Sequence, residues 1–140
     1  MDTSFFSHLN WLHIVVAAVG YFMLGALWYS KVLFGNTWIK STSIDMSNPN
    51  AKKGVGGIMA FTFILEFLVA VGLAILIYRL GLSGLMSGLK LGLFTGILFS
   101  GIGIFISYLY QMKPTVLSII DGGYHTVGQI IAAIILCMWQ

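Results

Sequence analysis

The residues of this sequence that could do chemistry are few, and they stand inside long apolar runs. Asp121, His125 and Gln129 follow one another at intervals of four in the last apolar run. Because residues four apart share one face of a helix, this spacing predicts a polar stripe along that helix. Glu66 interrupts an earlier apolar run by itself. An ionised carboxylate facing lipid is very costly, so we expect Glu66 and the stripe to face the protein interior, a subunit interface or water.

Glu66, His125 and Ser100 are predicted to lie at one depth in a membrane. Glu66 lies 13 residues after Lys53. His125 lies 12 residues after Lys113, and Ser100 lies 13 residues before it. At a rise of about 1.5 Å per residue, each lies roughly 20 Å from those lysines. Since an acid and a histidine stabilise each other's charged form, we expect Glu66 and His125 within reach of one hydrogen bond or one bridging water.

These polar residues support three interpretations, which the sequence leaves open. They could form a structural hydrogen-bonded set, because buried polar groups need partners whatever their role. They could carry a proton or an ion, since intramembrane acids and histidines often belong to relays. They could also hold a metal or cofactor, which the sequence does not identify. His13, near the start of the first apolar run and so at its predicted outer end, is better explained as an interfacial residue than as a ligand.

Composition places these residues in a membrane protein. The chain has 140 residues, of which 59% are hydrophobic and 8% charged. A membrane-spanning helix needs about 20 apolar residues. We therefore expect an all-α integral membrane protein, one domain of four transmembrane helices in an antiparallel bundle, since the later connections are short. The predicted helices cover residues 9–31, 54–79, 86–111 and 115–139.

The flanking charges predict the orientation. One side of the membrane carries five lysines, and the other carries only Arg79 and Lys90 among its side chains. The five are Lys31, Lys40, Lys52, Lys53 and Lys113. Because cytoplasmic loops are enriched in cations, the first loop is predicted in the cytoplasm and both termini outside it.

Aromatic residues mark the ends of the first span and the loop after it. Tryptophan and tyrosine are enriched at membrane interfaces, so we expect an interfacial position for Trp11, Trp28, Tyr29 and Trp38. The segment 32–53 is predicted to be a loop held against the membrane surface by its apolar residues. Within it, Asn48 and Pro49 resemble a helix start.

Small residues recur every fourth position in the third span. They are Gly84, Gly88, Gly92, Gly96 and Ser100. Such a ridge lets another helix approach closely. Packing within one subunit, an oligomer interface and a pore lining all remain open. Because four helices make a thin bundle, we expect a homo-oligomer.

Several function classes find no support. The sequence has no phosphate-binding glycine loop, zinc-protease helix or nucleophile elbow. Cys137 is the only cysteine, and it is predicted to be a buried, inert thiol. The scattered cations fit membrane flanks better than a nucleic-acid surface. Catalysis of the kind found in soluble enzymes is therefore not expected.

A set of motifs resembles a known family. It comprises Asn10–Trp11, the run Gly25–Ala26–Leu27–Trp28–Tyr29–Ser30, Leu33–Phe34–Gly35, Trp38, Asp121 and Tyr124–His125. In order and spacing these motifs resemble the small bacterial four-span membrane proteins catalogued as domain of unknown function 1761. The resemblance implies a four-helix membrane fold in a bacterial inner membrane and no assigned activity. Glu66 is not part of this pattern.

The leading functional hypothesis is a homo-oligomeric membrane protein that moves or binds a proton, ion or small solute along a polar path. That path would include Glu66, Asp121 and His125. One alternative is a metal-binding, haem-binding or redox protein that uses His13 or His125 as a ligand. Another is a scaffold or accessory subunit without chemistry of its own.

Overall fold

The computed structural model describes residues 7–45, 47–50 and 53–139, and the regular elements among them are all helices. The helices are α1 (Trp11–Trp28), α2 (Gly35–Thr42), α3 (Val55–Leu80), α4 (Leu85–Thr95), the π-helical segment η2 (Gly96–Gly101), α5 (Ile102–Tyr110) and α6 (Thr115–Met138). α4, η2 and α5 follow one another without a break. Four segments are long and apolar enough to cross a membrane: α1, α3, the run α4–η2–α5, and α6. The predicted all-helical chain with four candidate spans is confirmed.

The helix ends follow from local chemistry. The side chain of Asn10 accepts hydrogen bonds from the backbone N–H groups of Leu12 (3.1 Å) and His13 (3.3 Å), so α1 begins two residues later than predicted. α3 ends at Gly81, whose φ of 61° is the left-handed conformation that glycine tolerates best. Pro114 precedes α6 as its N-cap.

The loop after α1 differs from the prediction. It contains the short helix α2, whose first residue, Gly35, is buried against the carbonyl groups of Tyr29 and Ser30 with no room for a Cβ. Asn48 does not start a helix, because its side chain accepts a hydrogen bond from the N–H of Asn50 (2.9 Å) in a local turn. α3 begins later, after Gly54.

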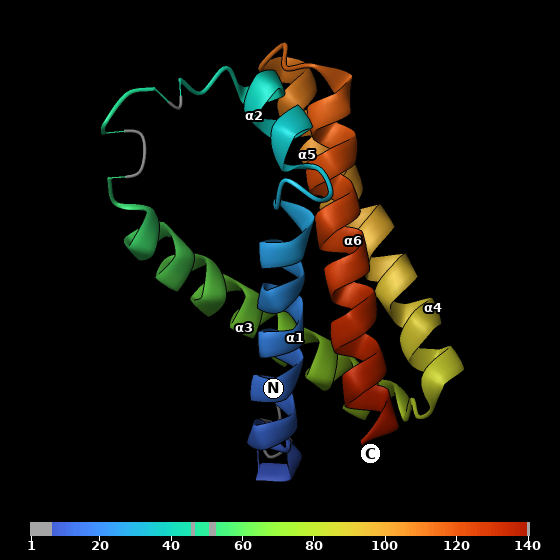
Figure 1. Ribbon diagram of the computed structural model, residues 1–140. Helices are drawn as coiled ribbons and strands as arrows, with labels where there is room; N and C mark the ends of the chain where they lie inside the picture. The colour runs from blue at the N-terminus through green and yellow to red at the C-terminus, as the bar shows by residue number, and fades with distance from the viewer. Residues whose placement is uncertain (1–6, 46, 51–52, 140) are drawn as a thin grey trace.

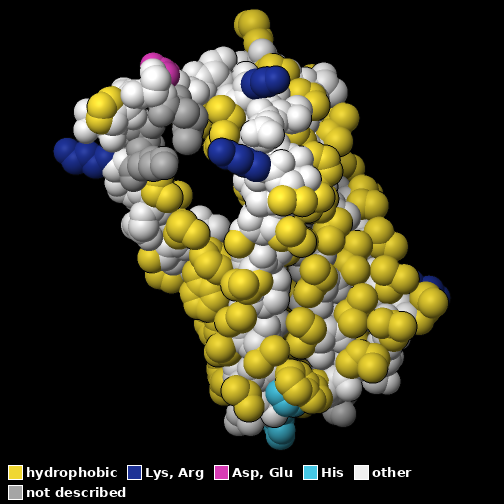
Figure 2. All heavy atoms as spheres, in the orientation of Figure 1, with side chains coloured by type: hydrophobic (Ala, Val, Ile, Leu, Met, Phe, Trp, Pro, Cys, Tyr) yellow, Lys and Arg dark blue, Asp and Glu magenta, His cyan; other side chains and the backbone are white. Residues whose placement is uncertain are grey.

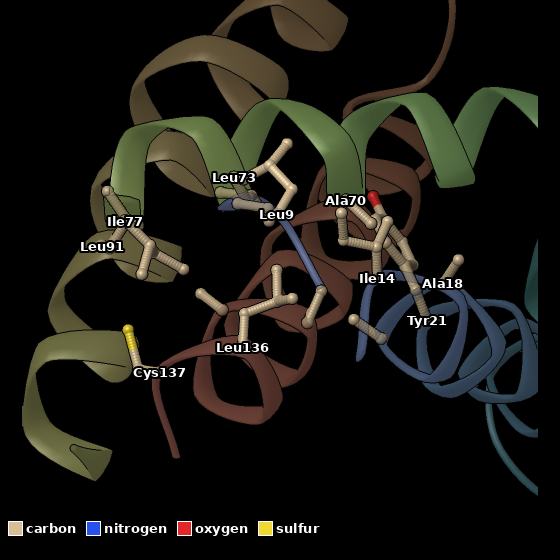
Figure 3. Close-up of a cluster of buried hydrophobic side chains, with 14 of the residues drawn as sticks. Leu9, Ile14, Ala18, Tyr21, Ala70, Leu73, Ile77, Leu91, Leu136 and Cys137 are labelled. Carbon is tan, nitrogen blue, oxygen red and sulfur yellow. The ribbon is translucent and has the colours of Figure 1, made fainter. Parts of the chain in front are cut away.

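α6 is the central helix of the bundle. It contacts every other helix. In Figure 1, α1 lies along one side of α6 and α4 with α5 along the other, while α3 crosses behind at a steep angle. The buried apolar side chains gather where α1, α3 and α6 meet (Figure 3), among them Ile14, Ala70 and Leu136. Cys137 lies buried at the edge of this cluster, as expected.

The glycine ridge of the third span packs against α6 of the same chain. A Cβ on Gly88 would lie 2.6 Å from the Cα of Ile134, and one on Gly96 would lie 2.6 Å from the Cα of Thr126. Gly92 is as tightly placed against Ile130. Gly84 contacts α6 in a different way: it is the N-cap of α4 with a φ of 81°, a Cβ there would meet nothing within 4 Å, and its N–H donates to the carbonyl of Cys137 at 2.9 Å.

The first half of α3 stands away from the bundle. Between Val55 and Leu65 no residue is buried, and a Cβ on Gly56 or Gly57 would meet nothing within 4 Å. Figure 2 shows an open space between this half of α3 on one side and α1 with α2 on the other. Glu66 is the first buried residue of α3. It therefore marks the point where α3 joins the bundle.

Candidate functional site

Asp121 is a buried carboxyl group held by two tyrosines. It is 8% exposed on α6. The hydroxyl of Tyr29, at the end of α1, donates to Oδ1 at 2.8 Å. The hydroxyl of Tyr108, on α5, donates to Oδ2 at 2.8 Å. Asp121 thus links three spans through hydrogen bonds to both of its oxygens.

Glu66 is a second buried carboxyl group, and it is only half satisfied. It is 3% exposed, and its Oε1 accepts a hydrogen bond from the hydroxyl of Tyr124 on α6. Its Oε2 is buried without a hydrogen-bond partner among the described residues. A buried polar oxygen without a hydrogen-bond partner costs free energy, so the burial of Oε2 is unfavourable unless another group stabilises it.

His125 has a different partner from Glu66. Its Nδ1 shares a hydrogen bond of 2.6 Å with the hydroxyl of Tyr21, which is fully buried on α1. No direct hydrogen bond joins Glu66 and His125 among the described residues, and each has its own partner. Successive residues of a helix point about 100° apart, so Tyr124 faces α3 while His125 faces α1.

The tyrosine rings connect these hydrogen bonds into one group. The ring of Tyr124 has its centroid 5.5 Å from that of Tyr21 and 5.3 Å from that of Tyr29. Tyr124 thus contacts the tyrosine of the His125 bond and a tyrosine of the Asp121 site. We call this group the carboxyl–tyrosine cluster; its members are Glu66, Asp121, His125, Tyr21, Tyr29, Tyr108 and Tyr124.

Ser100 and Gln129 form a pair beside the cluster, and the side chain of Gln129 also forms a hydrogen bond with Tyr21. The amide nitrogen of Gln129 donates to the hydroxyl of Ser100 at 2.5 Å, which joins η2 to α6. Gln129 is buried one turn beyond His125. A π-helical turn inside an α-helix is often found at functional sites. Here it brings a polar side chain of the third span onto the polar face of α6.

The predicted interfacial aromatics do not share one environment. The indole N–H of Trp28 donates to the carbonyl of Ile120 at 3.0 Å, and Tyr29 belongs to the cluster. Trp38 on α2 packs edge-on against Tyr29 with centroids 5.6 Å apart. Trp11 is half exposed.

His8 and His13 lie at the end of the bundle opposite α2 (Figure 2). The ring of His13 stacks on Trp139 at 4.6 Å, and that of His8 stacks on Tyr78 at 5.8 Å. Both histidines line a cavity of about 230 Å³. Among the described residues, no three His, Cys, Asp or Glu side chains are placed to hold one metal ion.

The tyrosines of the cluster are what sequence reasoning missed. Tyr21, Tyr108 and Tyr124 were not predicted as site residues, and Tyr29 was predicted only as interfacial. One usable signal was the spacing of Tyr21 and Tyr29, which are eight residues apart and so lie close to one face of a helix. Another was the position of Tyr124 beside His125 in the family motif.

The fold and the cluster define a class: an all-helical protein with four candidate membrane spans and two buried carboxyl groups tied to tyrosines. Within that class, the chain belongs to the family described as protein of unknown function (DUF1761), whose model matches residues 12–137. This match includes every member of the cluster. No curated protein matches the chain, and no solved structure does.

Proposed function

We propose that this protein takes up and passes on protons inside the membrane through the carboxyl–tyrosine cluster. The observation that carries the proposal is the composition of the cluster: two buried carboxyl groups, a histidine and four tyrosines, joined by hydrogen bonds and ring contacts. Carboxyl, phenol and imidazole groups all donate and accept protons.

The charge of the cluster favours a proton or a cation over an anion. Three of these hydrogen bonds are donated by tyrosine hydroxyls to carboxyl oxygens, and the fourth joins a tyrosine hydroxyl to the imidazole of His125. Anion sites are instead built from arginines, lysines or backbone N–H groups. Carboxyl oxygens inside a membrane attract positive charge.

The order of the cluster along α6 suggests a direction. Asp121 lies one turn closer to the α2 end of the bundle than His125. Under the orientation predicted from the lysines, that end faces the cytoplasm. Protons would enter at Asp121 and pass by way of Tyr29 and Tyr124 to Glu66, with the tyrosine hydroxyls turning between partners. A homo-oligomer in a bacterial inner membrane remains part of this proposal.

Proton movement can be measured in proteoliposomes that contain a pH-sensitive dye and carry an imposed membrane potential. Glu66→Gln keeps the shape and most of the hydrogen bonding of the side chain but cannot lose a proton. We expect this change to lower proton flux by about 100-fold, the scale of losing one positioned proton-transfer group.

Asp45→Asn is the matched control. Asp45 is an exposed loop carboxylate, and hydrogen bonds from Ser47 hold its pKa below the ordinary range. It stays ionised near neutral pH, so the control removes one surface charge and leaves the cluster intact. Equal flux from the wild-type protein and a folded Glu66→Gln variant would refute the proposal.

A further inference from the structure

Three features of the Glu66 region are not explained by proton movement alone. The buried Oε2 of Glu66 has no partner among the described residues, aromatic rings crowd around its tyrosine, and an open space lies beside the first half of α3. We propose that Glu66 and these rings bind a hydrophobic organic cation, such as a lipophilic amine, that arrives from the lipid through this space. The inference rests on the proposed function and names the second substrate of the same site.

The charge requirement comes from Glu66. Its carboxyl group is almost fully buried, and only Oε1 is hydrogen-bonded among the described residues. An ionised carboxylate in such a place is stabilised by a positive charge close to it. A bound cation would supply that charge, and protonation of the carboxyl group would supply it in the absence of the cation.

The rings around Tyr124 supply the rest of a cation site. Four side chains have ring centroids that lie 4.9 to 6.5 Å from the centroid of the Tyr124 ring. They are Tyr21, Trp28, Tyr29 and His125. The negative faces of aromatic rings attract organic cations, and Trp and Tyr are the best of them. A carboxylate among such rings favours a cation that is apolar on its outside.

Aromatic contacts continue from this group to the edge of the open space. Trp28 packs against Phe34 at 4.8 Å, and Tyr29 packs against Trp38 of α2 at 5.6 Å. In Figure 2, α2 and α1 border the open space on one side and the first half of α3 borders it on the other. A hydrophobic cation moving from this space toward Glu66 would pass aromatic side chains, beside the Lys or Arg side chains that Figure 2 also shows on this border.

The first half of α3 is largely apolar. A Cβ on Gly56 or Gly57 would meet nothing within 4 Å, and Phe63 packs edge-on against Phe22 of α1 at 5.6 Å. Most of residues 55–65 are exposed and apolar, with only Thr62 and Phe63 half-buried, so this half of α3 fits contact with lipid. A ligand dissolved in the bilayer would reach the space without crossing water.

The exchange at Glu66 is balanced in charge. The protonated carboxyl group releases one proton when one cation binds, and it takes up one proton when the cation leaves. Binding is therefore expected to release protons and to weaken as the pH falls, because protons and the cation compete for the same carboxylate.

Tetraphenylphosphonium is a suitable probe, because its charge does not change with pH and its surface is apolar. Binding to the purified protein in detergent is measured by tryptophan fluorescence and by proton release into weakly buffered solution. We expect saturable binding with about one proton released per cation. Glu66→Gln should weaken it at least about tenfold, whereas Asp45→Asn should leave it unchanged. Neutral triphenylphosphine oxide should not compete.

Saturable binding that is insensitive to pH and to Glu66→Gln would overturn the inference, and so would equal competition by the neutral compound or no binding at all. If Glu66→Gln does not fold, the pH dependence of wild-type binding decides the question. The two proposals fail separately. Proton flux without cation binding refutes only the cation site, and cation binding with proton release but no flux refutes only proton movement.

Discussion

Gly92→Leu tests the contact between the third span and α6. Gly92 is buried in the middle of α4, and a Cβ there would meet the backbone of Gln129 and Ile130 rather than a flexible side chain. A leucine at this position must push the two helices apart along the face that also holds Gly88 and Gly96. This contact packs the third span against α6 within one chain. Its loss should therefore destabilise the folded monomer.

The cost can be estimated from known overpacked sites. Forcing extra groups into a well-packed contact costs about 1–3 kcal/mol, and a clash with backbone belongs at the upper end. About 3 kcal/mol lowers the ratio of folded to unfolded protein roughly 100-fold. Gly103→Leu is the matched control, because a Cβ on Gly103 meets nothing within 4 Å and the side chain would point away from the bundle.

The assay is reversible unfolding in mixed micelles, followed by circular dichroism. We expect Gly92→Leu to lower the free energy of unfolding by about 3 kcal/mol and Gly103→Leu to change it by less than about 0.5 kcal/mol. If both variants unfold alike, the close approach of α4 and α6 does not stabilise the chain. If Gly92→Leu changes only the oligomer size, the ridge lies between subunits instead.

The remaining predictions concern the cluster and the topology. Tyr29→Phe removes one of the two hydrogen bonds to buried Asp121 and should lower the free energy of unfolding by about 1–3 kcal/mol. The control, Tyr110→Phe, changes a side chain that is 87% exposed and should have no measurable effect in the same unfolding assay. Equal stability of the two variants would show that the Tyr29 bond is dispensable. A reporter active only outside the cytoplasm, fused to either terminus, should be active; activity of a cytoplasmic reporter instead would reverse the predicted orientation.

The four spans could be predicted because lipid imposes simple rules. An apolar run of sufficient length must form a helix, since every backbone polar group needs a partner inside the segment. The same reasoning places charged residues inside the bundle, and Glu66 and Asp121 are both buried. It does not predict α2, because a short surface helix depends on contacts such as those of Gly35 with the preceding turn.

The hydrogen-bond partners of the polar residues could not be predicted from their depth in the membrane alone. A contact between two helices also depends on how each helix is rotated about its axis. Glu66 and His125 were expected to meet because their depths match. The rotation of α6 decides instead, since it turns Tyr124 toward Glu66 and His125 toward Tyr21. A tyrosine near a membrane interface is usually explained by the headgroup region, so residue type alone did not separate Tyr29 from an ordinary interfacial aromatic.

Tyr124 connects the two carboxyl sites through its hydroxyl and its ring. Its hydroxyl donates to Glu66, and its ring packs on Tyr29, whose own hydroxyl donates to Asp121. A change of charge at Glu66 alters how strongly the Tyr124 hydroxyl is held, and a rotation of that ring must displace the ring of Tyr29. Under the proposed function, a proton or cation bound at Glu66 would therefore act on Asp121 through packed rings, without a direct contact between the two carboxyl groups.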